Sequence, residues 1–223
     1  MHANTICNTL STSPGRTVLA ISGSLRRDSY NGLLLRAAAA SAPAGMQIQQ
    51  YNDLASVPLF SEDLEAAAVP AGVRRLREHI ANADAVIIAT PEYNQSVPGV
   101  LKNAIDWLSR PPDEVLAGKP VAVIGASAGR WGTRVAQSHL RHVLYAMEAL
   151  VMPQPSLFIG NAAKVFDDTG RIMDESATRV LQDLLLCFDD WISNLSFGAD
   201  VAGKAVQASD TVSLTIGRRA STP

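Results

Sequence analysis

The sequence has little of the features that would place it in several classes of protein. Its 223 residues contain only two cysteines, Cys7 and Cys187. Because these lie far apart, the sequence predicts no disulfide framework and fits a reducing cytoplasm. No stretch approaches the roughly 20 apolar residues of a membrane span. The formal net charge of -2 gives no electrostatic reason to expect nucleic acid or an anionic membrane as a partner. The first 16 residues also lack the basic start and apolar block of a signal peptide. We therefore expect a soluble, cytoplasmic protein whose partners are small molecules.

Apolar residues, by contrast, make up 47% of the chain, enough for the core of one domain. Short apolar runs alternate with segments of helical periodicity, which is typical of an α/β fold with a parallel sheet covered by helices on both faces, hence three layers. We expect this domain over residues 17–197, after a disordered N-terminal lead (1–16) and before a C-terminal tail (198–223). The five predicted strands are residues 17–22, 46–51, 84–89, 119–126 and 155–159.

The longest motif, TPEYNQSVPGVLKNAIDW, occupies residues 90–107. It directly follows the third predicted strand, whose near-continuous apolar run is typical of a strand buried on both faces. Pro98 suits the start of a helix, and apolar residues then recur at helical spacing. The motif is therefore a strand, an exposed polar loop and a helix, and open α/β sheets bind ligands at that edge.

The loop after the first strand, GSLRRDSYN (residues 23–31), predicts a phosphate site. Gly23 permits a tight turn, Ser24, Ser29 and Asn31 supply donors beside a helix N-terminus, and Arg26 adds a positive charge. A purely structural interpretation is equally open, in which Ser29 only caps the helix and Arg26 is a solvated surface charge. The chain contains neither G-x-G-x-x-G nor G-x-x-x-x-G-K-[ST], which disfavours dinucleotide pyrophosphate and nucleoside triphosphate cradles.

The loop after the fourth strand carries Gly125-Ala-Ser127-Ala-Gly129, which matches the nucleophile elbow of serine hydrolases. Those enzymes need an acid and then a histidine downstream of the serine, and no histidine here follows such an acid. A hydrolase that uses Ser127 therefore stays a minor alternative. His139 and His142 lie three apart on a helix without further ligands, so we predict no metal site.

The chain resembles the NADPH-dependent FMN reductase family, in particular its bacterial quinone and chromate reductase branch. The resemblance rests on residues 23–31, 91–99 (PEYNQSVPG), 101–107 (LKNAIDW) and 118–120 (GKP), within about residues 17–197. It implies a flavodoxin-like doubly wound sheet of strand order 2-1-3-4-5, with FMN at the switch point. By the same resemblance, the FMN phosphate is held by Ser24, Arg26, Ser29 and Asn31, with Tyr30 adjacent. The isoalloxazine ring is bordered by Pro91, Glu92, Tyr93, Asn94 and Gln95 on one edge and by Ser127 with Gly129 on the other.

A negative charge near a reduced flavin is unfavourable, so we expect Glu92 to contribute its backbone, with its side chain turned outward or salt-bridged. The chemistry belongs to the cofactor, since hydride passes from NADPH, or NADH, to FMN and electrons then pass to a small-molecule acceptor. This predicts ping-pong kinetics with quinones, flavin, azo dyes or chromate. Candidates for binding the 2′-phosphate of NADPH are Arg26, Arg27, Arg110 and Arg130, which the sequence does not rank.

A flavodoxin-like electron carrier would share the fold and FMN, but the Arg-bearing first loop and near-neutral charge favour a reductase. Self-association is a further expectation, because the helix containing Leu140, Val143, Leu144, Met147 and Leu150 has more apolar surface than one sheet face requires. A homodimer or homotetramer would bury the excess.

Overall fold

The structure is a computed structural model that describes residues 15–111, 114–167 and 169–195. Its centre is a parallel sheet in the order β2-β1-β3-β4-β5, with β6 also paired to β4. This confirms the predicted α/β fold and its strand order. The strands are β1 (Arg16–Ser22), β2 (Met46–Tyr51), β3 (Ala85–Ala89), β4 (Pro120–Ala126), β5 (Leu150–Val151) and β6 (Leu157–Ile159).

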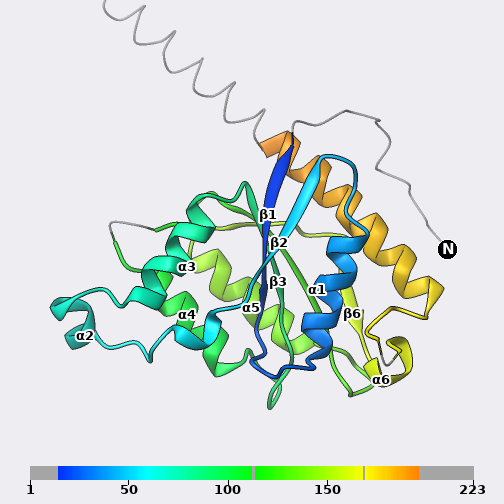
Figure 1. The fold of residues 1–223 in the computed structure, drawn as a ribbon, viewed down its shortest axis with the longest axis horizontal. Coiled ribbons are helices and arrows are strands. Elements are labelled where there is room, and N and C mark those ends of the chain that lie inside the picture. The colour runs from blue at the N-terminus through cyan, green and yellow to red at the C-terminus, as the bar shows by residue number, and fades with distance from the viewer. Residues whose placement is uncertain (1–14, 112–113, 168, 196–223) are drawn as a thin grey trace, which may run out of the picture.

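Helices cover both faces of this sheet, giving the three layers that Figure 1 shows. One face carries α1 (Tyr30–Ala40) and the helix of residues 175–195, whose Leu184 and Phe188 are buried against it. The other face carries α3 (Ala71–Ala81), α4 (Gly99–Leu108) and α5 (Arg134–Ala146). Short helices lie in the connections: η1 (Leu54–Ser56), α2 (Glu62–Ala67) and α6 (Ala162–Val165).

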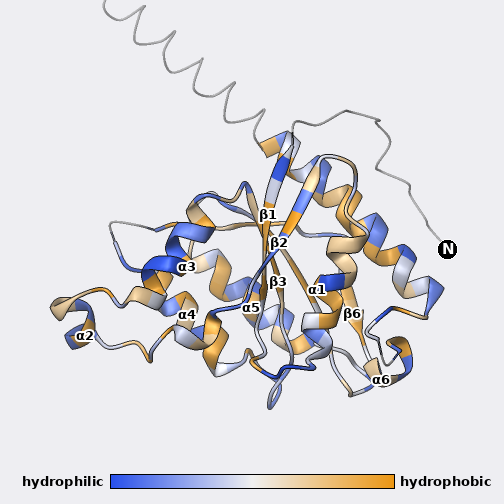
Figure 2. Ribbon diagram, viewed as in Figure 1, coloured by the Kyte–Doolittle hydropathy of each residue, from blue (hydrophilic) through white to orange (hydrophobic). Residues whose placement is uncertain are grey.

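Successive residues of each central strand enter the two cores alternately. In β3, Ile87 packs on the α1 face and Ile88 on the α4 face, and every residue of the strand is buried. Such strands are apolar throughout because both of their faces are covered. Figure 2 shows the result as hydrophobic colouring along the central strands.

The fifth strand departs from its prediction. Residues 155–159 were expected to form it, but β4 pairs with β5 near its start and with β6 near its end, so the edge is made in two pieces. Pro153 and Pro155 lie between the pieces and have no N–H to donate to a ladder, which explains the break. The connection expected to be irregular before α3 also contains η1 and α2. Ser61 caps α2, and acidic residues fill its first turn, a local signal of a helix start.

The predicted ends of the domain fall mostly outside the described residues. The strand β1 begins at Arg16, one residue before the predicted start, and the rest of the predicted lead (1–14) is not described. The same holds for residues 196–223, which include the predicted domain end and the tail. Among the described residues, no helix is long and apolar enough to cross a membrane.

Candidate functional site

Three loops meet at the carboxyl ends of neighbouring strands. The first loop (residues 23–29) follows β1, the second loop (90–98) follows β3 and the third loop (127–133) follows β4. They enclose a cleft of about 600 Å³, a volume typical of small-molecule sites, which span about 300–1,000 Å³. The cleft is lined by Ser24, Arg26, Ser29, Tyr30, Asn31, Pro91, Glu92, Tyr93, Ala126, Ser127, Ala128, Gly129, Trp131 and Gly132.

Two glycines allow the loops to approach one another. A Cβ on Gly23 would lie 3.0 Å from Leu101 Cδ2 and 3.2 Å from Pro91 Cδ, so the first and second loops touch through this residue. A Cβ on Gly125 would clash with the Thr133 hydroxyl and the Thr90 carbonyl oxygen. Close packing beneath the cleft therefore requires glycine at position 125, and at position 23 a larger residue would need Leu101 or Pro91 to shift by a few tenths of an ångström.

Ser29 at the end of the first loop and Asn31 at the start of α1 form hydrogen bonds with the backbone, whereas Arg26 contacts an aromatic ring. The Ser29 hydroxyl accepts a hydrogen bond from Asn31 N at 3.2 Å and caps α1. The Asn31 amide donates to Ala126 O and accepts from Ala126 N, both at 2.9 Å, which ties α1 to the end of β4. The Arg26 guanidinium lies 5.5 Å from the centroid of the Tyr30 ring, and that ring stacks on Phe166 at 6.0 Å.

Arg26 and Ser29 meet the requirements of an anion site, although Ser29 is also a cap. The first N–H groups of a helix have no partner within the helix, and the helix dipole favours negative charge there. Arg26 has no carboxylate partner among the described residues. The end of the cleft at α1 is therefore positive and rich in donors.

The second loop contains a tight two-residue hairpin. Tyr93 N donates to Ser96 O at 3.2 Å and Ser96 N donates to Tyr93 O at 3.0 Å. Asn94 and Gln95, between them, have φ of 50° and 59°, the left-handed geometry of hairpin turns. Tyr93 lines the cleft and its hydroxyl lies 3.4 Å from Ser24 Oγ, whereas Asn94 and Gln95 form the tip and do not line the cleft.

The side chain of Glu92 is neither turned outward nor salt-bridged, which corrects the expectation from sequence. Its Oε2 accepts hydrogen bonds from Val135 N and Ala136 N, each at 2.9 Å. These are backbone donors at the start of α5, where Thr133 makes no side-chain cap. A carboxylate is favourable at that end of a helix because the free N–H groups and the dipole both attract it. Glu92 thus joins the second loop to the helix that follows the third.

The third loop is fixed by backbone bonds to residues 159–162. Ser127 N donates to Ile159 O at 2.9 Å, and Asn161 N donates to Gly129 O at 3.0 Å. The Ser127 hydroxyl donates to Gly132 O at 2.9 Å, within its own loop. His139 Nδ1 lies 3.2 Å from Ser96 Oγ. Nothing in these contacts supports a hydrolytic serine, and the described residues hold no group of three metal-ligating side chains.

Trp131 is the lining residue that sequence reasoning did not place in the site. Its side chain is 65% exposed, and the Arg130 guanidinium lies 4.4 Å from its ring centroid. A large aromatic within a glycine-rich ligand loop is a usable sequence signal. Ala126, Ala128 and Gly132 also line the cleft, but small residue types of this kind do not indicate a binding site.

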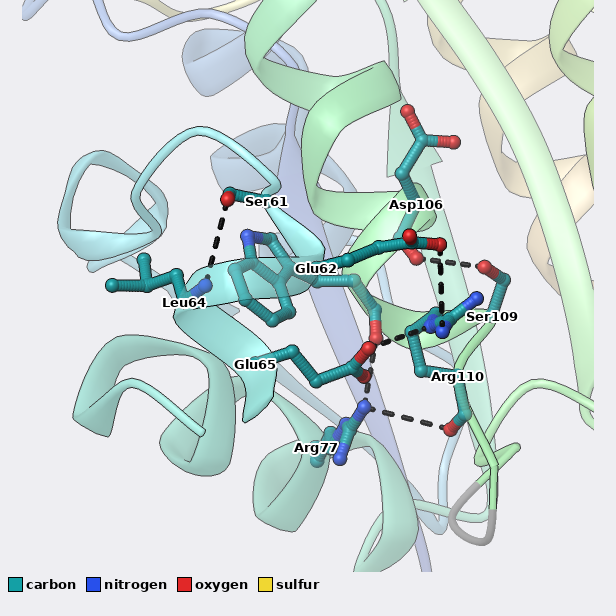
Figure 3. A network of polar contacts seen from close by, with 9 residues as sticks. Ser61, Glu62, Leu64, Glu65, Arg77, Asp106, Ser109 and Arg110 are labelled. Carbon is teal, nitrogen blue, oxygen red and sulfur yellow. Dashed lines mark hydrogen bonds and ion pairs between the residues drawn. The ribbon is translucent and has the colours of Figure 1, made fainter. Parts of the chain in front are cut away.

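Arg110, one of the four cations suggested from sequence, lies elsewhere. It follows α4, which runs back from the second loop, so it lies about 15 Å along the helix from the cleft edge. Its Nε donates to Glu65 Oε2 at 2.9 Å, and its Nη2 lies 3.9 Å from Glu62 Oε1. Figure 3 shows this network, in which Arg77 also reaches the Arg110 carbonyl oxygen. Carboxylates of α2 therefore compensate the Arg110 charge.

The residues at the two ends of the cleft suit the chemistry of FMN. Arg26 and the start of α1 suit a phosphate group, while Pro91, Tyr93 and the backbone of the third loop offer flat surfaces and peptide groups for a ring system. Of the predicted site residues, ten line this one cleft, and Asn94 and Gln95 are the two that do not.

Comparison with known proteins gives consistent matches. The sequence model of a family described as NADPH-dependent FMN reductase matches residues 16–164. The chain is 47% identical over 178 residues to an NAD(P)H-dependent FMN reductase of Pseudomonas aeruginosa, covering 80% of this chain and 96% of that protein. It is 42% identical over 181 residues to a quinone reductase of Escherichia coli K12, again covering 80% and 96%.

Among solved structures, the chain is similar to FerB, a flavoenzyme NAD(P)H:(acceptor) oxidoreductase from Paracoccus denitrificans. The TM-score is 0.74 at 37% sequence identity, covering 80% of this chain and 98% of that chain. The matched portion therefore spans almost the whole length of each of these relatives.

Proposed function

The chain belongs to the NADPH-dependent FMN reductase family, and we propose that the cleft formed by its three loops holds FMN and is where substrates react. Proteins of this family are oxidoreductases that use FMN and NAD(P)H. The observation that carries the assignment of the site is the convergence of three loops on one cleft whose α1 end is positive and whose remainder is flat and open.

We assign the phosphate of FMN to the α1 end. The Arg26 guanidinium, held over Tyr30, supplies a charge that no carboxylate among the described residues compensates. Ser24 and Ser29 add hydroxyl groups beside the first N–H groups of α1. Asn31 positions the start of α1, because its side-chain amide forms hydrogen bonds with the backbone of Ala126. Charge-assisted hydrogen bonds of this kind are about twice as strong as neutral ones.

The second and third loops border the ring. Pro91 and Tyr93 form one wall, and Ser127 with Gly129 forms the other, held by the backbone bonds to residues 159–162. Glu92 keeps its negative charge at the start of α5, where helix N–H groups bind it. When bound, FMN supplies hydride acceptance from a nicotinamide and electron donation to a second molecule. No acid or base of the chain is required at the substrate, so we expect donor and acceptor to use one open face in turn, with ping-pong kinetics.

We propose that the acceptors are small molecules of the quinone type, reached through the side of the cleft where Tyr93 and Trp131 are exposed. Flat acceptors stack favourably on such rings. Flavins, azo dyes and chromate remain further candidates for the same face.

We also propose a homodimer or homotetramer in the cytoplasm. Leu140 and Leu144 of α5 are fully buried within the subunit, but Tyr145 is 79% exposed and Val135 and Leu150 are each 38% exposed. Residual apolar surface of this kind favours self-association. Sedimentation velocity would test it, and a monomer at micromolar concentration would contradict it.

An anaerobic absorption spectrum of the purified protein with FMN, recorded before and after NADPH, tests the function. We expect a protein-bound flavin band that bleaches with NADPH and returns when a quinone is added. A band that binds but does not bleach would favour an electron carrier, and the absence of flavin binding would overturn the assignment of the cleft.

A further inference from the structure

We propose that Arg130 and Trp131 form the recognition element for the adenosine end of NADPH, with Arg130 selecting its 2′-phosphate. This inference rests on the proposed function and concerns the same cleft. It resolves a choice that the sequence leaves open among four arginines, because the structure places each of them differently.

Trp131 is presented to solvent from a loop that is itself fixed. The Ser127 hydroxyl closes the loop by donating to Gly132 O at 2.9 Å, and Asn161 N anchors it at Gly129 O. Gly132 has φ of 69°, and a Cβ there would lie 3.1 Å from the backbone of Phe158. The loop is therefore packed on β6 at one side of its tip. An indole that is 65% exposed on such a support is a preorganised stacking surface.

Arg130 lies on that indole with its charge uncompensated. Its guanidinium is 4.4 Å from the ring centroid, and no carboxylate pairs with it among the described residues. Stacking on an aromatic ring restrains a guanidinium while leaving its N–H groups available at the edge. A planar fork of donors with a full positive charge is the group that best matches a phosphate.

The other three candidates are less suitable. Arg26 lies over Tyr30 at the end of the cleft assigned to the FMN phosphate. Arg110 is bound by Glu65 and Glu62 beyond the far end of α4. Arg27 is exposed, and among the described residues no aromatic ring restrains it, whereas Arg130 lies over Trp131, which lines the cleft. A fifth cation, Arg134, stacks on Phe158 at 4.5 Å, but Phe158 does not line the cleft, whereas Trp131, the partner of Arg130, does.

The arrangement matches the difference between the two nicotinamide cofactors. Both carry an adenine ring, which can stack on the Trp131 indole, but only NADPH carries the 2′-phosphate that Arg130 would bind. Trp131 should therefore contribute to binding of either cofactor, and Arg130 should contribute only to binding of NADPH. A general effect of positive charge near the cleft would not separate them in this way.

Binding of the isolated adenosine halves tests this without any redox chemistry. Isothermal titration of the FMN-loaded protein with 2′,5′-ADP and with 5′-AMP should give tighter binding of the former by about tenfold, the value of one charge-assisted contact. Arg130→Ala should abolish the difference, Arg130→Lys should keep part of it, and Trp131→Ala should weaken both ligands. Arg179→Ala is the matched control, because it removes the same charge from an exposed position on the helix of residues 175–195, and it should change neither ligand.

Equal binding of the two ligands by the wild-type protein, or a preference for 2′,5′-ADP that survives Arg130→Ala, would overturn the inference. Steady-state reduction gives a second measurement, in which Arg130→Ala should raise KM for NADPH about tenfold and leave KM for NADH unchanged. Failure of the inference and failure of the proposed function are distinguishable: flavin that NADPH does not bleach would remove the reductase assignment, whereas the comparison of 2′,5′-ADP with 5′-AMP decides the role of Arg130.

Discussion

Arg26 and Arg130 differ from Arg110 and Arg75 in whether a carboxylate compensates their charge. Arg26 and Arg130 lie over the rings of Tyr30 and Trp131, which both line the cleft. Arg110 also lies 5.5 Å from the centroid of the Phe60 ring, but carboxylates of α2 bind it, and Asp53 binds Arg75 at 2.7 Å. An aromatic partner restrains a guanidinium without cancelling its charge, while a carboxylate does both. The comparison teaches that a restrained cation with an uncompensated charge indicates a binding site when its aromatic partner also lines a cleft, a condition that Arg134 and Phe158 do not meet.

The largest expected effect is on FMN binding, after removal of the cation at the cleft. Replacing Arg26 and Ser29 together by alanine should weaken FMN binding about a hundredfold, since charge-assisted hydrogen bonds contribute about 1.5–3 kcal/mol each. The dissociation constant is measured by quenching of flavin fluorescence. Ser29→Ala alone separates the loss of the α1 cap, worth about 1 kcal/mol of stability, from the loss of the cation. Unchanged FMN affinity in the folded double variant would remove the phosphate assignment.

Arg110→Ala tests the other side of the comparison. We expect a loss of about 1 kcal/mol in the free energy of unfolding, because the pairs with Glu62 and Glu65 are partly exposed. The corresponding fall in Tm is about 2–4 °C, measured by calorimetry, while FMN affinity stays at the wild-type value. A large loss of FMN affinity in this variant would show that compensated arginines also serve the cofactor, contrary to the comparison.

Glu92→Gln asks what a carboxylate does when its partner is a helix end instead of an arginine. The amide oxygen can still accept from Val135 N or Ala136 N, so only the interaction of charge with the dipole is lost, about 0.5 kcal/mol of stability. The sharper measurement is the reduction potential of bound flavin, which should shift little because the charge is already bound at α5. A shift of tens of millivolts would mean that the flavin senses this charge directly.

The smallest effect concerns the exposed pair of Arg75 and Asp53. Hydrogen bonds from Arg75 and then Ser56 hold the pKa of Asp53 below its ordinary value. The stability contributed by this pair is therefore present above the unfolded-state pKa of about 4 and is lost as the pH falls through the lower folded-state pKa. Chemical denaturation of wild type and Asp53→Asn between pH 7 and 3 should show a steeper acid loss for the wild type. Parallel profiles would contradict the assigned cause.

Local patterns sufficed for the parts of the fold that depend on local physics. The buried run of β3 and the prolines that begin α3 and α4 were recognisable, because burial on both faces and helix starts leave marks in neighbouring residues. Which strand lies next to which came from the family resemblance. The division of the fifth strand was missed because only the apolar residues after the two prolines were interpreted as a strand, and those before them were assigned to a loop.

The sequence indicated which residues line the site, but not the hydrogen bonds that hold them. Asn31 meets Ala126 across 95 positions, and Glu92 meets Ala136 across 44. No local pattern reveals that a carboxylate of one loop caps a helix that follows another, so Glu92 was expected to be turned outward or salt-bridged. The sequence did not rank the four candidate arginines for the same reason, since the carboxylates that compensate Arg110 lie on a helix that was not predicted.

The hairpin of the second loop gives the protein a place to vary. Its two backbone bonds close between Tyr93 and Ser96, and the tip residues Asn94 and Gln95 contribute nothing to the lining of the cleft. Because Tyr93 at the base of the hairpin is exposed and lines the cleft, we expect exchange at the tip to alter the rim beside it and to leave the walls and the phosphate end unchanged. A combinatorial library at these two positions, enriched in residues that tolerate positive φ such as glycine and asparagine, is thus a route by which laboratory evolution can redirect the enzyme toward new acceptors.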